Sequence, residues 1–187
     1  PGSTTVTAAD VMQVKPHVVS HLNGGPTAIP LEEVKKLIDE TNITLEMVQC
    51  GNFKVLKQAI EWLKDKNQLD RVILGNDSPS GTGIIPLGIL RSVSFISSMT
   101  GVSAEEALCM ATGNTARTYD LNVGIIEEGR EADLVLMDAP MGSAGNNCIK
   151  ALEAGDLPGI SMVIIDGKVV ATKSRNTPPP TTKAVVC

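Results

Sequence analysis

Aromatic residues, basic runs and long apolar stretches are all scarce in this sequence of 187 residues. Phe, Tyr and Trp make up only 2% of it, so platforms for stacking bases or sugars are few. The net charge is -5 and no basic run occurs, which argues against a nucleic-acid surface. No apolar run approaches the roughly 20 residues of a membrane span. Hydrophobic residues nevertheless make up 42% of the chain, enough for a globular protein with a sizeable core.

Cysteine is also sparse, and its spacing excludes two common uses. The four cysteines lie far apart, at positions 50, 109, 148 and 187, with no C-x-x-C pair. This spacing argues against a zinc knuckle and against a disulfide framework. We therefore expect reduced thiols in a cytoplasmic protein, with Cys109 buried on a helix.

The first half of the chain alternates between strand-like and helix-like segments. Strands are predicted at residues 18–22, 44–50 and 71–74, and the helices between them at residues 31–40 and 53–66. Each strand ends in a turn rich in Gly or Asn. This order predicts βα units and a parallel sheet, in either a βα-barrel or a doubly wound fold. Three units are too few to close an eight-stranded barrel.

The second half changes character near Leu121. Residues 84–99 predict a buried helix, and a capping box at Ser103 starts another that runs to about residue 112. After residue 121, apolar strands and a hairpin with Asp166-Gly167 at its tip predict a small β-rich module. We divide the chain into residues 1–121, 122–174 and an extended Pro/Thr-rich tail, 175–187. The loop-like start suggests the C-terminal part of a longer protein.

Two residues at predicted strand ends are the best candidates for chemistry. His21 precedes Asn23-Gly24-Gly25, and Asp77 follows Gly75-Asn76. The carboxyl ends of parallel strands are where α/β folds place their active sites. His and Asp there suit a divalent metal such as zinc, or equally a base and its orienting partner. The alternatives are a packed or exposed His21 and an Asx-turn at Asp77.

Three stretches together resemble the amidohydrolase superfamily. They are residues 75–77, residues 110–116, and the G-x-I-x-x-G-x-x-A-D-L-V pattern of residues 124–135. The wording of residues 20–27, 49–52, 75–83 and 172–179 is closer still to enamidase-type members of the family. The resemblance implies an α/β fold: the C-terminal part of a (β/α)8 TIM barrel, about strands 6 to 8, plus the returning part of a small β-sandwich domain.

The resemblance also implies an activity and its residues. It implies a metal-dependent hydrolase of carbon–nitrogen bonds other than peptide bonds, with a small-molecule cyclic amide as substrate and metal-bound hydroxide as nucleophile. His21 and Asp77 would bind the metal, zinc or a zinc/iron pair, and Asp77 would also be the catalytic base. Asn23, Ser80 and Thr82 are the expected substrate contacts, because they lie on the same rim loops. We further expect a homo-oligomer.

The same resemblance leaves a large gap. The family's other metal ligands, the His-x-His pair of strand 1 and those of strands 4 and 5, are not in this sequence and would lie before residue 1. One alternative is therefore an inactive fragment that serves as a scaffold or an oligomer subunit. Another is a deaminase or a dihydropyrimidinase-like enzyme on the same fold.

Overall fold

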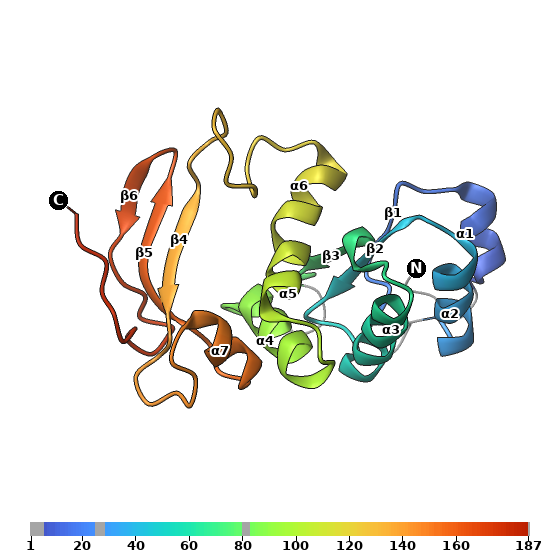
Figure 1. The fold of residues 1–187 in the computed structure, drawn as a ribbon. Coiled ribbons are helices and arrows are strands. Elements are labelled where there is room, and N and C mark those ends of the chain that lie inside the picture. Colours follow the sequence, from blue (N-terminus) through green and yellow to red (C-terminus); the bar gives the residue numbers. More distant parts are fainter. Residues whose placement is uncertain (1–5, 25–28, 80–82, 187) are drawn as a thin grey trace.

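The computed structural model describes residues 6–24, 29–79 and 83–186. Within these ranges the chain forms two separate three-stranded sheets, with helices before, between and after their strands (Figure 1). None of the described helices has the length and apolar character that would let it cross a membrane.

The first sheet is parallel, as the alternation of strands and helices predicts. Its spatial order is β1 (Val18–Val19), β2 (Thr44–Val48) and β3 (Val72–Gly75). The strand β1 is shorter than predicted, because the chain turns from residue 20 onward. The strand β3 starts one residue later than predicted: Arg71 instead ends a short 3-10 helix, η1 (Leu69–Arg71).

Arg71 has a structural role at the amino end of this sheet, directly before β3. Its guanidinium is buried and donates hydrogen bonds to the carbonyl oxygens of Ile38 and Ile43 and to Gln68 Oε1, at 2.7 to 2.9 Å. Burial lowers the pKa of this guanidinium, the adjacent Asp70 opposing the shift. Arg71 thus joins the ends of neighbouring elements far from the carboxyl edge of the sheet.

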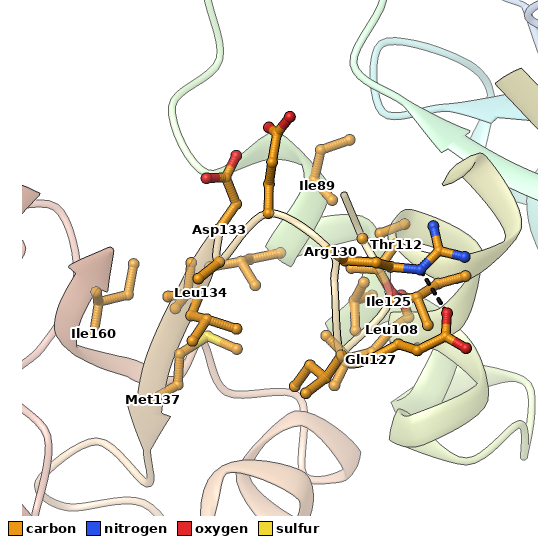
Figure 2. A pocket seen from close by; sticks show the side chains of 18 residues that line it. Ile89, Leu108, Thr112, Ile125, Glu127, Arg130, Asp133, Leu134, Met137 and Ile160 are labelled. Carbon is orange, nitrogen blue, oxygen red and sulfur yellow. Dashed lines mark hydrogen bonds and ion pairs between the residues drawn. The ribbon is translucent and has the colours of Figure 1, made fainter. Parts of the chain in front are cut away.

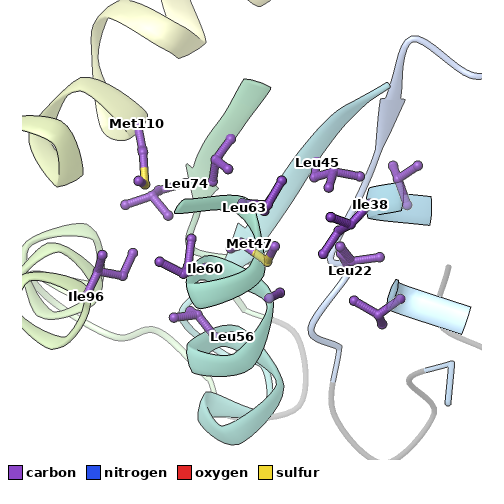
Figure 3. Close-up of a cluster of buried hydrophobic side chains, with 14 of the residues drawn as sticks. Leu22, Ile38, Leu45, Met47, Leu56, Ile60, Leu63, Leu74, Ile96 and Met110 are labelled. Atoms are coloured by element: carbon purple, nitrogen blue, oxygen red, sulfur yellow. The ribbon is translucent and has the colours of Figure 1, made fainter. Parts of the chain in front are cut away.

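The helices α1 (Ala8–Val14), α2 (Leu31–Glu40) and α3 (Phe53–Asp65) connect the strands of this sheet or precede them. Alternate residues of β2, Leu45 and Met47, are fully buried and belong to one core with the apolar stripes of α2 and α3 (Figure 3). Because side chains alternate along a strand, Glu46 and Val48 point to the opposite face. We call that face, with the paired Ile73 and Gly75, the inner face of the sheet.

Three helices follow β3: α4 (Gly88–Met99), α5 (Ala104–Ala111) and α6 (Gly113–Tyr119). The predicted start of α4 at residue 84 is wrong, since Ile84 is 82% exposed and the helix begins at Gly88. The prediction that Cys109 is buried is also wrong, because it lies on the exposed side of α5.

The capping box at the start of α5 is confirmed. Ser103 Oγ accepts from the backbone N–H of Glu106 at 3.2 Å, and the N–H of Ser103 donates to Glu106 Oε2 at 3.1 Å. We expect Ser103→Ala to lower the free energy of unfolding by about 1 kcal/mol, since it leaves an N-terminal amide of the helix without its acceptor. Urea unfolding would measure the change. Ser103→Thr keeps the cap and should lose much less; an equal loss would contradict this explanation.

The second sheet is antiparallel and consists of β4 (Leu134–Asp138), β5 (Gly159–Ile165) and β6 (Lys168–Ala171). The predicted Asp166-Gly167 turn joins β5 and β6. The helix α7 (Cys148–Glu153) lies between β4 and β5 and packs on α4 and α5, where Ser97 Oγ donates to the carbonyl oxygen of Leu152 at 3.0 Å. The small sheet is thus tied to the helices that follow β3 (Figure 1).

The Pro/Thr-rich tail, predicted only to be extended, is held by hydrogen bonds. The N–H of Met141 donates to the carbonyl of Pro179, and the N–H of Thr181 donates to that of Ala139, at 2.9 and 2.8 Å. The N–H of Thr182 also donates to Asp138 Oδ2 at 3.0 Å. Hydrogen bonds from the Thr182 side chain and from the backbone N–H of Ala139 hold the pKa of the Asp138 carboxyl below its usual value, and the Thr182 side chain contributes most.

Candidate functional site

The candidate site lies at the carboxyl edge of the parallel sheet. His21 comes two residues after β1, and Asp77 comes two residues after β3. Since all three strands run in the same direction, both residues leave the sheet at the same edge, with β2 between them. Neighbouring strands are about 4.8 Å apart, so the two strand ends are about 10 Å apart.

Both residues adopt a left-handed backbone conformation that side chains other than Gly rarely take. The φ angle is +38° at His21 and +51° at Asp77. Such strained positions gather at functional sites, although Asn, Asp and His are the non-Gly residues that adopt this conformation most often.

The carboxylate of Asp77 is available for binding. Asp77 is exposed, and its side chain makes no hydrogen bond or ion pair within the part of the chain that the structure describes. An Asx-turn needs an N–H two residues further on, and that position is Pro79, which has none. The simplest structural alternative for Asp77 therefore fails.

Asn23 is placed differently from its predicted role. Asn23 is 0% exposed, and its side chain binds both backbone polar groups of Val48. Its Oδ1 accepts from the Val48 N–H at 2.7 Å, and its Nδ2 donates to the Val48 carbonyl at 2.9 Å. This arrangement does not support a substrate contact for Asn23, and instead makes it a link between the β1 turn and the end of β2. Ser80 and Thr82, the other predicted contacts, lie outside the described residues.

Glu46 is a site residue that the sequence reasoning missed. It lies on the inner face of β2, and its Oε2 accepts a hydrogen bond from the backbone N–H of His21 at 3.2 Å. Its Oε1 lies over Gly75, where a Cβ atom would come within 2.4 Å of it. A carboxylate between two apolar neighbours in a predicted strand is the signal that could have found it.

Two further acceptors lie at the same edge. Gln49 Oε1 and Asn76 Oδ1 are buried and accept no hydrogen bond from the described residues. Gln49 follows β2 directly, and Asn76 follows β3 directly. Asn76 Oδ1 faces the start of α4, where a Cβ atom on Gly88 would come within 1.8 Å of it.

The donor types at this edge fit a transition metal. An imidazole nitrogen and carboxylate oxygens are the ligands that zinc and non-haem iron accept in catalytic sites. Yet no group of three or more His, Cys, Asp or Glu that could hold a metal ion occurs among residues 6–24, 29–79 and 83–186. His21 and Asp77 can therefore supply only part of a coordination shell.

A cavity of about 490 Å³ lies away from this edge, between the helices α4 and α5 and the strand β4 (Figure 2). Its walls are mainly apolar, including Ile89, Leu108 and Met137, and its Arg130 pairs with Glu127 at 2.7 Å. The conspicuous pattern of residues 124–135 forms much of its lining. Gly124, with φ +81°, packs against the carbonyl of Thr112 and the side chain of Ala116. The pattern thus joins the helices to the second sheet.

Comparison with known proteins agrees with the resemblance seen in the sequence. Enamidase from Eubacterium barkeri is 57% identical over 179 residues, which are 96% of this chain and 46% of that protein. The 5-methylthioadenosine/S-adenosylhomocysteine deaminase of Pyrococcus furiosus is 26% identical over 73% of this chain and 36% of its own length. The chain thus spans about half of enamidase and less of the deaminase.

The folds agree as well. The crystal structure of enamidase, described as a member of the amidohydrolase superfamily, superposes with a TM-score of 0.94 at 56% identity, over 98% of this chain and 48% of that one. The described residues therefore form part of the enamidase fold, a TIM-barrel fold of that superfamily. The sequence profile of the Amidohydrolase family matches residues 3–170, and the chain belongs to this family.

Proposed function

We propose that this chain is the C-terminal portion of a metal-dependent hydrolase that cleaves a carbon–nitrogen bond of a small cyclic amide. The observation that carries the proposal is the match to enamidase over 96% of the chain, combined with His21 and Asp77 at one sheet edge. In this proposal β1, β2 and β3 are barrel strands 6, 7 and 8. The sheet β4–β6 is the returning part of the β-sandwich domain.

The roles of the residues follow from their chemistry. His21 and Asp77 hold the metal together with ligands from the rest of the protein. A metal held there would supply Lewis-acid chemistry: it would polarise the amide carbonyl and would lower the pKa of a water molecule towards about 7. The carboxylate of Asp77 would also accept the proton of the attacking water and return it to the leaving nitrogen. Ser80 and Thr82 remain proposed substrate contacts.

Metal removal from the full-length enzyme tests this function. We expect the purified enzyme to contain stoichiometric zinc or iron and to hydrolyse lactams. A chelator should abolish that activity, and readdition of Zn²⁺ or Fe²⁺ should restore it. Full activity after complete metal removal would overturn the proposal. If the full-length protein contains no metal and hydrolyses no lactam, the scaffold alternative is favoured.

A substrate panel separates the remaining candidates. The similarity to the Pyrococcus furiosus deaminase makes deamination the second candidate. Lactams, hydantoins and aminopurines can be assayed side by side with the metal-loaded enzyme. Hydrolysis of lactams supports the proposed substrate class, turnover of hydantoins alone would indicate a dihydropyrimidinase-like enzyme, and turnover of aminopurines alone would indicate a deaminase. A homo-oligomer and a cytoplasmic location remain predictions from the sequence.

A further inference from the structure

Glu46 contacts the β1 turn in two ways at once. Its backbone carbonyl accepts from the N–H of Leu22 at 2.9 Å, and its carboxylate Oε2 accepts from the N–H of His21 at 3.2 Å. Two successive amides of the turn are therefore held by one residue of the neighbouring strand. A third hydrogen bond also holds His21, whose backbone is in the left-handed region: the Gly24 N–H donates to the His21 carbonyl at 2.8 Å.

The carboxylate of Glu46 has no other evident task. It forms no ion pair within the described part of the chain, and no other hydrogen bond to it is found there. A half-buried carboxylate on the face of a sheet that usually carries branched apolar residues costs desolvation free energy. Its hydrogen bond to a strained residue gives a physical reason for its presence.

Gly75 provides the space that this carboxylate occupies. It pairs with Val48 on β3, and a Cβ atom there would lie 2.4 Å from Glu46 Oε1 and 3.3 Å from Val48 Cγ1. The φ angle of Gly75 is not in the left-handed region, so the backbone itself would accept Ala. Gly at position 75 is therefore required by the space that the Glu46 carboxylate occupies, and not by the backbone conformation.

We propose that Glu46 is a positioning residue: its carboxylate fixes the left-handed turn at His21, and so sets the direction of the His21 imidazole at the sheet edge. Gly75 is the space that makes this contact possible. The proposal rests on the proposed function for its catalytic meaning, because it treats His21 as a metal ligand. Residues that orient ligands in this indirect way commonly change metal affinity 10- to 100-fold when they are replaced.

The test compares four variants of the full-length enzyme, with His21→Ala added to remove the proposed metal ligand itself. Glu46→Ala removes the acceptor, and Gly75→Ala displaces the carboxylate while leaving the backbone bond from Leu22 in place. Glu46→Gln keeps an amide oxygen that can accept from His21, and Glu128→Ala is a control at an exposed Glu with no contact in the described structure. Zn²⁺ affinity is measured by competition with a chelating dye. In the metal-free protein, the His21 imidazole signal is recorded by ¹⁵N NMR.

We expect Glu46→Ala and Gly75→Ala to weaken Zn²⁺ binding about 10- to 100-fold, to lower kcat with little change in KM, and to shift the His21 signal. Glu46→Gln should stay within about threefold of the parent enzyme, and Glu128→Ala should not differ from it. Unchanged Zn²⁺ affinity and an unchanged His21 signal in Glu46→Ala would overturn the proposal. So would a large rise in KM in Glu46→Gln with Zn²⁺ affinity intact, which would instead place Glu46 against the substrate.

Two measurements separate this proposal from the proposed function. If the parent enzyme binds no metal, the metal-site proposal fails, but the NMR signal of His21 still reports whether Glu46 orients it. If the parent enzyme binds Zn²⁺ and loses it in His21→Ala, yet the Glu46 variants bind it normally, only the positioning role fails. Should Glu46→Ala not fold, Gly75→Ala and Glu46→Gln carry the same comparison.

Discussion

Replacing Asp77 by Asn in the full-length enzyme should lower kcat by about 10² to 10⁴-fold, the range expected when a general base is lost. Asn keeps the size of the side chain and accepts the left-handed backbone at least as well as Asp does, so the turn should remain. The carboxylate is exposed and makes no contact within the described part of the chain, so its replacement costs no hydrogen bond there. Steady-state kinetics and thermal unfolding of the same preparations would measure both effects.

Asp120 offers a matched control for this substitution. It is also an exposed Asp in the left-handed region, with φ +52° against +51° at Asp77, but it ends α6, away from the carboxyl edge of the sheet. Asp120→Asn should therefore leave kcat within about twofold and change stability by less than about 0.5 kcal/mol. If Asp77→Asn and Asp120→Asn had equal kcat values, Asp77 would be a turn residue and the proposed mechanism would lose its base.

Local pattern predicts the regular elements well because their causes are local. The helix at residues 31–40 coincides with α2, and the helix at residues 53–66 differs from α3 only at its last residue. The apolar residues of both recur at helical spacing, and the Ser103 cap and the Asp166-Gly167 turn depend on a few adjacent residues. The start of α4 was misjudged because Ile84 and its neighbours are apolar but lie in a loop.

The site was harder to predict because its contacts join residues far apart in the sequence. Glu46 meets the His21 amide only through the register of two parallel strands, in which Val19 pairs with Leu45. The Asn23 side chain likewise reaches Val48 from 25 positions away. Composition and periodicity carry no information on such pairings. They did place His21 and Asp77 at the ends of strands, and the parallel order of the sheet then puts both at one edge.

The structural role of Asn23 leads to a prediction on stability. Asn23→Ala would leave the N–H and the carbonyl of Val48 without the partners that bind them at 2.7 and 2.9 Å. Val48 is 2% exposed, so water has little access to replace these bonds. Each unsatisfied buried group costs about 1 to 3 kcal/mol, and we expect a loss of about 2 to 5 kcal/mol in the free energy of unfolding.

Asn52 is the matched control for Asn23, because it too is an Asn at a turn of the same sheet edge. Its Oδ1 caps α3 by accepting from the N–H groups of Lys54 and Val55, but it is exposed, so water can partly replace it. Asn52→Ala should therefore cost only about 1 kcal/mol. Urea midpoints of the two metal-free full-length variants give the comparison. Equal losses of unfolding free energy would mean that water enters beside Val48. The two hydrogen bonds between Asn23 and Val48 would then not be what holds the His21 turn to β2.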